Sequence, residues 1–381
     1  MWNAVTSGKF SADMRYRFEN VDQAGKSNDA NASTLRTRFG YRTGGYHGLS
    51  LLLEGVNVTV LGLHDYNDTV NNRTAFPVVA DPPLTQVNQA YLQYRGPLNT
   101  RLRTGRQRIK LDNDRWIGNV GFRQNEQTFD ALSVVSGALP ATTLTYAYLW
   151  RVNRIFGVDS PKGVLHTDAQ VIHGAWRGLP DATLVGYAYL LEFDNAPALS
   201  SATYGARLTG RLPVAGVRLL YTAEYARQSD YGNSPTSFGL DYFLGTGGVA
   251  YGPFFLKAGY EILGGNGTHS VQTPLATLHA FDGWADVFLT TPAAGLRDLR
   301  LHAGAAYLGA HLDAVFHRFT PDDGAPAFGN EWDLQLKRTF TRHYTLGLTY
   351  ADYHANEPGT GTFNHDTRKL WIWAQMHFTS L

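Results

Sequence analysis

Cysteine is absent from this 381-residue chain, which excludes disulfide bonds and metal sites built on thiolates. Charge is also scarce: Asp, Glu, Lys and Arg make up 17% of the residues, and the formal net charge is +1. A balance so close to neutrality gives no electrostatic reason to expect nucleic acid as a partner. No apolar signal segment precedes the first strand-like residues, so we expect any export signal to have been removed from this chain.

Long apolar runs are missing as well. The mean hydropathy is −0.26, whereas a helix that spans a membrane needs about 20 consecutive apolar residues. The longest charge-free stretch, 131–150, contains Gly137 and Pro140, which predict a hairpin instead of a helix. Glycine and aromatic residues are abundant, with 40 Gly, 20 Phe, 21 Tyr and 8 Trp, and this composition excludes a disordered chain.

Polar and apolar residues alternate with a period of two along most of the chain. Between Lys9 and Glu19 the odd positions are all polar and the even positions are all apolar. This is the pattern of a β-strand with one polar and one apolar face. We count about 18 such segments of about 9 to 12 residues. Clear examples are 35–41, 144–150, 217–225, 331–337 and 370–378.

Short and long connections take turns between these segments. The short ones lie near 43–48, 96–99, 137–142, 177–182, 212–216, 252–253, 293–297 and 341–343. The long ones are 20–33, 61–85, 108–128, 153–167, 194–200, 228–237, 264–276, 320–329 and 355–368. This alternation predicts an all-β fold, a transmembrane antiparallel up-and-down β-barrel of about 18 strands with both termini on the short-turn side. We expect a single barrel domain over residues 1–381 in the bacterial outer membrane, because a closed barrel is the only sheet that spans a bilayer.

Three segments are assigned on weaker evidence. Residues 49–60 are apolar on both faces, so their register stays open. Residues 298–319 form either one long strand or two strands joined at Gly309-Ala310, and we assign one strand because two would place the 320–329 loop on the wrong side. Residues 277–292 are then needed as a strand to complete the count. A soluble β-sandwich is the alternative, but it does not explain polar faces rich in Arg, Glu, Asp and Gln on strand after strand.

Basic residues gather between Thr100 and Asn125, where seven basic and two acidic residues leave a local charge of +5. In a narrow, low-dielectric passage such a cluster attracts anions, and guanidinium groups bind carboxylates bidentately. Lipopolysaccharide phosphates or solvent are alternative neighbours for these side chains. Arg101 and Arg103 share a face with Arg106 and Arg108 only if a β-bulge intervenes after Gly105. The predicted pore-lining residues are Arg15, Arg17, Arg36, Arg38, Arg101, Arg103, Arg106, Arg108, Asp112, Asp114, Arg115 and Arg123.

No compact set of residues predicts catalysis or metal binding. A barrel hydrolase of the lipase or esterase type needs Ser and His beside a carboxylate, and the histidines at 279, 302, 311, 317 and 377 are scattered. Short Asp/Asn runs at 65–68 and 112–114 offer calcium ligands but are more typical of turns. We therefore predict no catalytic residue, no metal and no cofactor. An outer-membrane hydrolase and an adhesion or assembly barrel are the alternatives to a channel.

Two blocks of sequence resemble the alginate-export family of proteobacterial outer-membrane porins, in particular its smaller members. The first comprises Asn88–Tyr94, Gly105–Gln107, Leu111–Asn113 and Arg115–Asp130, and the second comprises Lys257–Gly265, Gln272–Asp286 and Phe288–Pro292. The resemblance implies a monomeric 18-stranded barrel whose electropositive, arginine-lined constriction passes anionic polysaccharide or other anions. The arginines in the matching block are Arg101, Arg103, Arg106, Arg108, Arg115 and Arg123.

Together, the pattern and the resemblance predict a porin for passive diffusion of anionic solutes through an arginine-lined lumen, which the loop containing Arg115 narrows. Organic acids and acidic oligo- or polysaccharides such as alginate are the expected solutes. The other expected partners are the lipid bilayer and its lipopolysaccharide.

Overall fold

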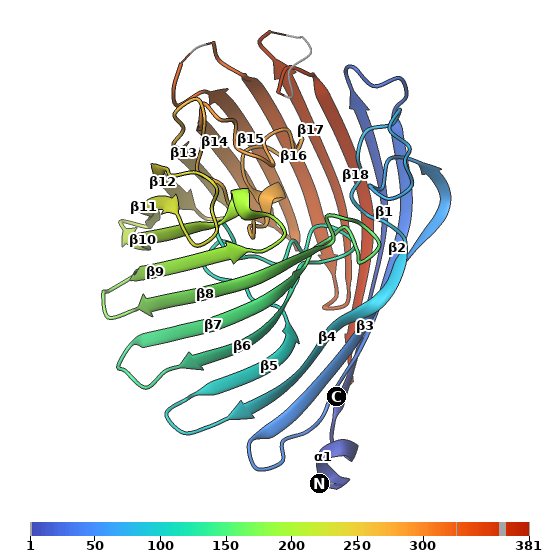
Figure 1. Cartoon of the computed structure of the whole chain (residues 1–381), viewed down its shortest axis with the longest axis vertical. Coiled ribbons are helices and arrows are strands. Elements are labelled where there is room, and N and C mark those ends of the chain that lie inside the picture. The colour runs from blue at the N-terminus through green and yellow to red at the C-terminus, as the bar shows by residue number, and fades with distance from the viewer. Residues whose placement is uncertain (1, 325, 358–362, 381) are drawn as a thin grey trace.

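The computed structural model describes residues 2–324, 326–357 and 363–380. Eighteen strands form one antiparallel sheet, in which each strand pairs with its neighbours in the sequence. The sheet closes because β1 (Lys9–Gln23) also pairs with β18 (Thr367–Thr379), in a register from Ser11 opposite Thr379 to Gln23 opposite Thr367. The closed up-and-down barrel predicted from the sequence is confirmed (Figure 1).

The other strands follow one another around the barrel. They are β2 (Ala30–Arg42), β3 (Leu49–Asp65), β4 (Leu84–Arg95), β5 (Arg101–Gln107), β6 (Thr128–Ser136), β7 (Thr142–Asn153), β8 (Val164–Trp176), β9 (Ala182–Phe193), β10 (Ser201–Val214), β11 (Val217–Asp230), β12 (Gly239–Tyr251), β13 (Phe254–Leu263), β14 (Leu296–Tyr307), β15 (Ala310–Thr320), β16 (Gly329–Phe340) and β17 (Tyr344–Ala355). The helical segments are α1 (Trp2–Thr6), η1 (Pro197–Leu199) and η2 (Leu278–Ala280). Within the described ranges, none of the helices has the length and apolarity needed to cross a membrane.

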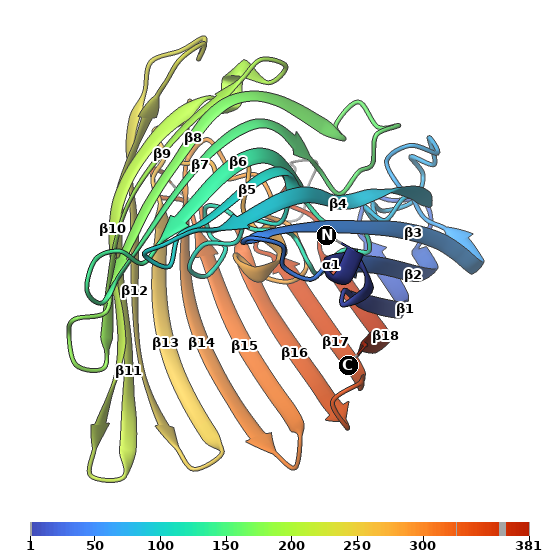
Figure 2. The same cartoon turned by 90° about the horizontal axis from the view of Figure 1, so that it is seen from below.

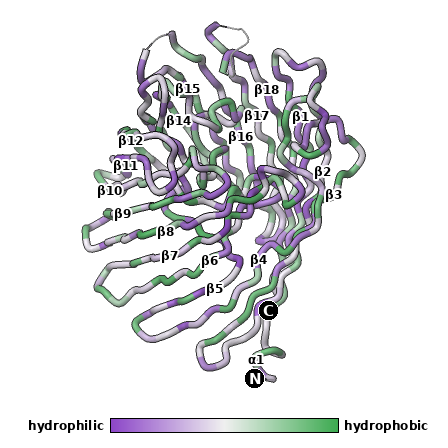
Figure 3. The backbone as a smooth tube through the Cα atoms, viewed as in Figure 1, coloured by the Kyte–Doolittle hydropathy of each residue, from purple (hydrophilic) through white to green (hydrophobic). Residues whose placement is uncertain are grey.

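Apolar side chains point outward and polar ones inward along the strands, which is the reverse of a soluble protein. On β2, Phe39 is 61% exposed, whereas Arg36 on the opposite face is 2% exposed; on β16, Trp332 is 54% exposed and Glu331 is fully buried. The colours in Figure 3 accordingly change back and forth between hydrophilic and hydrophobic along the strands. An apolar exterior around a closed sheet is the surface of a barrel that lies in lipid. The chain is therefore a transmembrane barrel of the outer-membrane type, and the β-sandwich alternative is excluded.

The barrel has an end with short turns and an end with long loops, which we call the turn end and the loop end. Connections such as 43–48, 137–141, 215–216 and 252–253 lie at the turn end, and both termini lie there too (Figure 1). Two connections from the loop end, 108–127 and 264–295, fold back into the barrel and lie inside the ring of strands in Figure 2. We call them the first and the second inner loop.

Two sequence-based assignments are wrong, and their errors cancel in the strand count. Residues 298–319 belong to two strands, β14 and β15, which a tight turn at Leu308 and Gly309 joins; both turn residues have positive φ. Such a two-residue turn suits a hairpin, and the alternative of two strands joined near Gly309 is the one that the structure supports. Residues 277–292 form no strand and are part of the second inner loop. The count therefore stays at 18, because one extra strand in 298–319 replaces the strand expected at 277–292. The 321–328 connection then lies at the loop end, as predicted.

The inner loops pack against an apolar part of the barrel wall. Trp116 and Ile117 of the first inner loop and Phe288 of the second are 7%, 1% and 3% exposed. They belong to one buried cluster with residues of the wall such as Leu149 on β7 and Tyr189 on β9. Aromatic and aliphatic burial of this extent stabilises a loop by several kcal/mol, at about 1.5–3 kcal/mol per side chain. The inner loops are thus fixed parts of the interior.

Candidate functional site

The candidate site is the lumen of the barrel where the two inner loops meet. The Gly118 N–H donates to the Leu275 carbonyl at 2.9 Å, and the Thr277 N–H donates to the Asp114 carbonyl at 3.0 Å. Gln127 adds side-chain hydrogen bonds to the carbonyls of Gly118 at 2.9 Å and of Leu275 at 3.0 Å. These contacts join segments that lie about 150 residues apart in the sequence and make the two loops one unit across the lumen.

Arg115 fastens the first inner loop to the far wall and to the second inner loop. Its side chain is fully buried; Nε lies 2.8 Å from a Glu261 oxygen on β13, and Nη1 donates to Asp282 Oδ2 at 2.9 Å. The guanidinium also lies over the Phe281 ring, 4.6 Å from its centroid. Removing one partner of a buried ion pair typically costs about 3–5 kcal/mol. Arg115 is therefore an anchor and is not a free charge in the passage.

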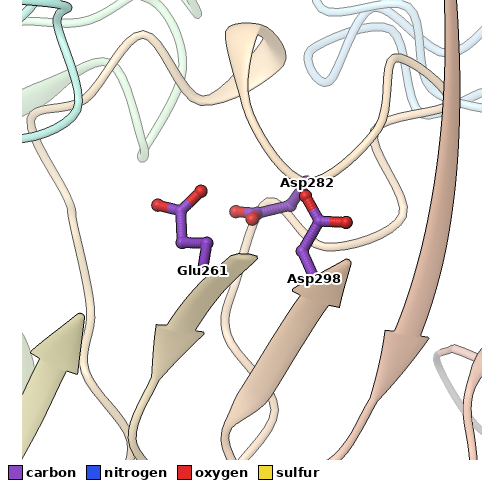
Figure 4. Close-up of side chains that lie close together, drawn as sticks. All are labelled: Glu261, Asp282 and Asp298. Atoms are coloured by element: carbon purple, nitrogen blue, oxygen red, sulfur yellow. The ribbon is translucent and has the colours of Figure 1, made fainter. Parts of the chain in front are cut away.

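The carboxylates that meet Arg115 form a compact acidic cluster. Glu261, Asp282 and Asp298 come from β13, the second inner loop and β14, and their oxygens lie within 4.8 Å of one another (Figure 4). Arg300 on β14 adds a second guanidinium, with Nη1 3.2 Å from Glu261 and 3.8 Å from Asp298. Burial raises the pKa of Asp282 to about 6, although the Arg115 guanidinium opposes the shift; Glu261 and Asp298 reinforce it. Two guanidinium groups thus face three carboxylates, and His317 on β15 lies 2.9 Å from Asp298 as a further partner.

A second ion-pair network holds Arg123. Its Nη1 lies 3.1 Å from Glu19 on β1, and its Nη2 donates to Asp286 Oδ2 of the second inner loop at 2.9 Å. Lys369 on β18 donates to the same Asp286 oxygen at 2.7 Å, and His279 bonds the other oxygen at 2.7 Å. Although burial acts in the opposite direction, Lys369, His279 and Arg123 hold the pKa of Asp286 well below its usual range.

Four arginines predicted to line the pore lie on the lumenal face of β1 and β2, and we call them the basic wall: Arg15, Arg17, Arg36 and Arg38. Arg15 stands directly opposite Arg36 in the sheet. Its guanidinium donates to the carbonyls of Gly121 and Phe122 at 3.1 and 2.8 Å, so backbone dipoles of the first inner loop solvate this charge. Arg17 binds Asp81 and Arg36 binds Asp13, while Arg38 lies 3.6 Å from Glu126. The basic wall therefore faces the first inner loop directly.

Arg108 continues this polar contact at the base of the first inner loop. It binds Glu126, and its Nη2 donates to Glu54 on β3 at 2.6 Å. Asn88 donates to both carboxylates, at 2.5 Å to Glu126 and 2.6 Å to Glu54. Although burial acts in the opposite direction, Arg38 and Arg108 lower the pKa of Glu126. Both carboxylates are therefore neutralised locally.

The structure places Arg106 on the outside of the barrel, contrary to the expected pore-lining position. The registers of β5 with β4 and β6 run through Gly105 without a shift, so no bulge reverses the alternation there. Arg106 points away from the lumen and pairs with Asp130, with Nε 2.8 Å from Oδ1 and Nη2 3.2 Å from Oδ2. Of the predicted pore-lining set, Arg106 alone is placed on this outer face.

Arg103 and Arg101 keep the lumenal face of β5. Arg103 donates to Gln93 at 2.8 Å and lies 4.7 Å from the centroid of the Tyr91 ring. The acidic candidates sit in the first inner loop beside basic partners: Asp112 lies 3.0 Å from His173 on β8, and Asp114 lies 3.0 Å from Lys110. Neither is a free charge in the passage.

Sequence reasoning missed two arginines of the same wall. Arg42 on β2 donates to the Tyr91 hydroxyl at 3.0 Å, and Arg95 on β4 stands directly opposite Arg101. Both lie near enough to Arg103 to act on its charge. The alternation that placed Arg36 and Arg38 on the polar face applies at Arg42 too, once β2 is extended to its observed end. We call Arg42, Arg95, Arg101 and Arg103 the turn-end arginines.

Neither a protein-family model nor a curated protein matches this chain. Among solved structures it is similar to OpdK of Pseudomonas aeruginosa with vanillate, with a TM-score of 0.78, 14% identity and coverage of 99% of this chain and 100% of that chain. It is also similar to OccAB2 of Acinetobacter baumannii (TM-score 0.80, 14% identity, 100% of both chains) and to OpdO of P. aeruginosa (TM-score 0.77, 15% identity, 100% of this chain and 99% of that chain). The chain has the fold of an outer-membrane porin. These proteins are Opd and Occ porins, so the comparisons give no support to the resemblance to the alginate-export family.

Proposed function

We propose that the protein is an outer-membrane porin through which small anionic solutes diffuse along the arginines of β1 to β5. The observation that carries this proposal is the unequal pairing of lumenal charges. Buried lumenal carboxylates such as Glu224 and Glu261 have arginine partners at 2.5 and 2.8 Å. In contrast, Arg15 and the four turn-end arginines form no ion pair within 4.0 Å in the described part of the chain.

Unpaired guanidinium groups in a passage walled by protein raise the local concentration of anions, because the low-dielectric walls focus their field. They also bind carboxylate groups with two parallel hydrogen bonds, while exchange between neighbouring arginines keeps each contact short-lived. In this proposal an anion passes Arg15 and then the turn-end arginines, and it leaves at the turn end, which is the periplasmic end of such barrels. The functional unit is the monomer, surrounded by the bilayer and its lipopolysaccharide.

Small solutes fit this arrangement better than a polysaccharide. The two inner loops are joined by backbone hydrogen bonds and anchored by fully buried Arg115, so they occupy the lumen permanently. One of the similar structures contains vanillate, a small aromatic carboxylate. Organic acids and acidic sugars are therefore the favoured class, and an alginate oligosaccharide is the useful comparison.

Uptake into proteoliposomes tests this function with matched solutes. Glucuronate and glucose have nearly the same size and differ by one carboxylate, and neither crosses lipid unaided. We expect glucuronate to enter at least about threefold faster than glucose, because the arginine row favours the anion, and we expect an alginate tetrasaccharide to enter more slowly than both.

Equal or faster entry of glucose would contradict the preference for anions. Rapid entry of the alginate tetrasaccharide would instead support an acidic polysaccharide as the solute. Absence of uptake together with esterase activity of the purified protein would favour the hydrolase alternative.

A further inference from the structure

A second basic region lies on the wall opposite the arginines of β1 to β5, at the turn end. A pocket of about 570 Å³ is lined by Arg177, Arg211 and Lys257. These residues lie near the turn ends of β8 to β13, the strands that Figure 2 shows at one side of the barrel. Asp181 is the only carboxylate among the residues that line it, so three cations and one carboxylate give a formal charge of +2. A volume of this size is typical of sites for small organic ligands.

The pocket faces the lumen. On β10, Arg211 lies four residues after Arg207, and side chains an even number of residues apart share one face of a strand. Arg207 is lumenal, because it is buried and pairs with Glu224 at 2.5 Å. The same rule places Thr222 on this face, two residues before Glu224 on β11. A solute that leaves through the turn end therefore meets this pocket from inside the barrel.

Threonines form a continuous row across the floor of the pocket. Thr183 pairs with Thr209, Thr209 with Thr222 and Thr222 with Thr246, so the row crosses four neighbouring strands. The hydroxyls of Thr209 and Thr222 lie 3.0 Å apart and bond each other. For Thr183 and Thr246, no side-chain hydrogen bond exists to any described residue, and both residues line the pocket. Two hydroxyl donors are thus free to bind a ligand in the middle of a basic region.

The stem of Lys257 lies against Gly248 on the neighbouring strand. Gly248 stands opposite Lys257 in the sheet, and a Cβ at Gly248 would lie 2.7 Å from Lys257 Cγ and 2.6 Å from the Leu256 carbonyl oxygen. Only a residue without a side chain leaves this space to the lysine stem. Thr246, the hydroxyl nearest along β12, is two residues from Gly248 on the same lumenal face.

The cations of the pocket are not neutralised. Arg177 donates to the Thr143 hydroxyl at 3.1 Å, and Lys257 Nζ lies 4.7 Å from the centroid of the Phe255 ring. Across the residues that the structure describes, Arg177, Arg211 and Lys257 make no contact with a carboxylate within 4.0 Å. The next basic residue deeper in the lumen, Arg207, is paired. The free positive charge of this wall is therefore concentrated at the pocket.

We propose that this pocket is a binding site for small polycarboxylate anions at the periplasmic exit of the barrel. Arg177, Arg211 and Lys257 supply the charge, and the threonine row supplies hydroxyl donors that hold carboxylate oxygens in register. Its role in solute exit rests on the proposed function, but the binding itself does not. Two basic surfaces on opposite walls at the same end would hold an anion between them before release.

Citrate is a suitable probe because it carries three carboxylates and fits the volume. Its affinity for the full-length protein in detergent is measured by isothermal titration calorimetry at low salt. Arg211→Gln together with Lys257→Gln is expected to weaken citrate binding at least about tenfold, because two charge-assisted contacts are lost. The matched control, Arg227→Gln together with Arg368→Gln, removes two charges that are paired with Asp241 and Asp22 away from the pocket, and is expected to bind citrate as the wild type does.

Thr246→Val removes one hydroxyl and keeps every charge, so it separates a defined site from diffuse attraction. We expect it to weaken citrate binding about threefold to fivefold, the loss of one hydrogen bond. Unchanged affinity in Thr246→Val, an equal loss in the control pair, or no citrate binding by the wild type would overturn the pocket. Intact citrate binding in a protein without anion selectivity would support the pocket and overturn the proposed function, so the two failures are distinguishable.

Discussion

Arginine has two roles inside this barrel, and ion pairing distinguishes them. Arg115 and Arg123 are buried among carboxylates that lie more than 100 residues away in the sequence, and they fasten the inner loops. Arg101 and Arg103 lack such partners in the described structure, and in the proposed function their charge attracts solutes. The local charge of +5 between residues 100 and 125 is thus mostly compensated, and its uncompensated part lies on a few side chains near the turn end.

The first residue-scale prediction concerns the turn-end arginines. Neutralising Arg101 and Arg103 together, as Arg101→Gln and Arg103→Gln, is expected to lower the chloride-over-potassium permeability ratio at least about twofold, because two unpaired charges leave the passage. Reversal potentials in planar bilayers measure this ratio. Arg227→Gln with Arg368→Gln is the control of equal charge. An unchanged ratio in Arg101→Gln/Arg103→Gln would place these residues away from the path of the ions.

The second residue-scale prediction follows from the pKa of Asp282, which burial raises from 3.8 to about 6 against the opposing effect of Arg115. A raised folded pKa means that the charged carboxylate destabilises the folded state; this cost is complete above about pH 6 and is gone below about pH 4. Lowering the pH from about 7.5 to 5 should therefore stabilise the protein by about 1 kcal/mol through this group.

Asp282→Asn should lack this increment, whereas Asp323→Asn, in an exposed loop at the loop end, should retain it. Thermal unfolding in detergent at the two pH values, compared between wild type and variants, measures the difference. His279, whose pKa burial lowers, is present in all three proteins, so its contribution cancels in the comparison. An identical pH dependence in Asp282→Asn would show that Asp282 is not the group responsible.

Among the elements, the strands follow from the sequence and the inner loops do not. Alternation identified most strands, because each strand has one lipid-facing and one lumenal side. The 277–292 segment was assigned as a strand mainly to complete the strand count, but it is part of the second inner loop, in which Ala285 and Phe288 are buried inside the barrel. The 298–319 segment was assigned as one strand to keep the 320–329 loop on its expected side and the strand count even. The alternation in fact reverses at the turn, because buried Asp298 on β14 has an even number and buried His317 on β15 an odd one.

The candidate site was predictable to the same extent. The alternation of polar and apolar positions placed four arginines on the polar face, and the structure places their side chains inside the barrel: Arg15, Arg17, Arg36 and Arg38. The same alternation allowed Arg103 and Arg106 to share a face only if a bulge followed Gly105. The registers of β5 run through that position without a shift, so the two side chains lie on opposite faces. The partners of Arg115 and Arg123 were not predictable, since no local pattern relates positions so distant in the sequence.

The element-scale prediction concerns the contact between the inner loops at Gly118. A Cβ at this position would lie 2.7 Å from Asp114 Cβ and 2.9 Å from the Thr277 backbone nitrogen, so a larger residue must separate the loops. Gly118→Val is expected to raise single-channel conductance on the order of twofold, because we propose that the inner loops narrow the lumen.

Gly186→Val is the matched control, since a Cβ at Gly186 meets no described heavy atom within 4 Å. Both variants should keep the heat-modifiable migration of a closed barrel on gels. Unchanged conductance in Gly118→Val would mean that the inner loops do not narrow the passage.

At the scale of the whole molecule, a closed sheet with an apolar exterior encloses a lumen whose charges are divided between two walls. Carboxylates on β11 to β16 are largely occupied by arginine, histidine or backbone donors. Unpaired lumenal cations in the described structure include the turn-end arginines and, on the opposite wall, Arg177, Arg211 and Lys257. In the proposed function these cations make the available charge of the passage positive, although the net charge of the chain is only +1.

The reversal potential of the wild-type channel in a KCl gradient tests this account most directly. The measurement needs no knowledge of the natural solute, because it reports the sign of the available charge along the path. We expect the sign of the reversal potential to show that chloride permeates faster than potassium. The chloride-over-potassium permeability ratio should decrease toward unity as the salt concentration rises, because salt screens the arginines. A reversal potential of the opposite sign, showing that potassium permeates faster than chloride, would contradict the positive charge of the passage.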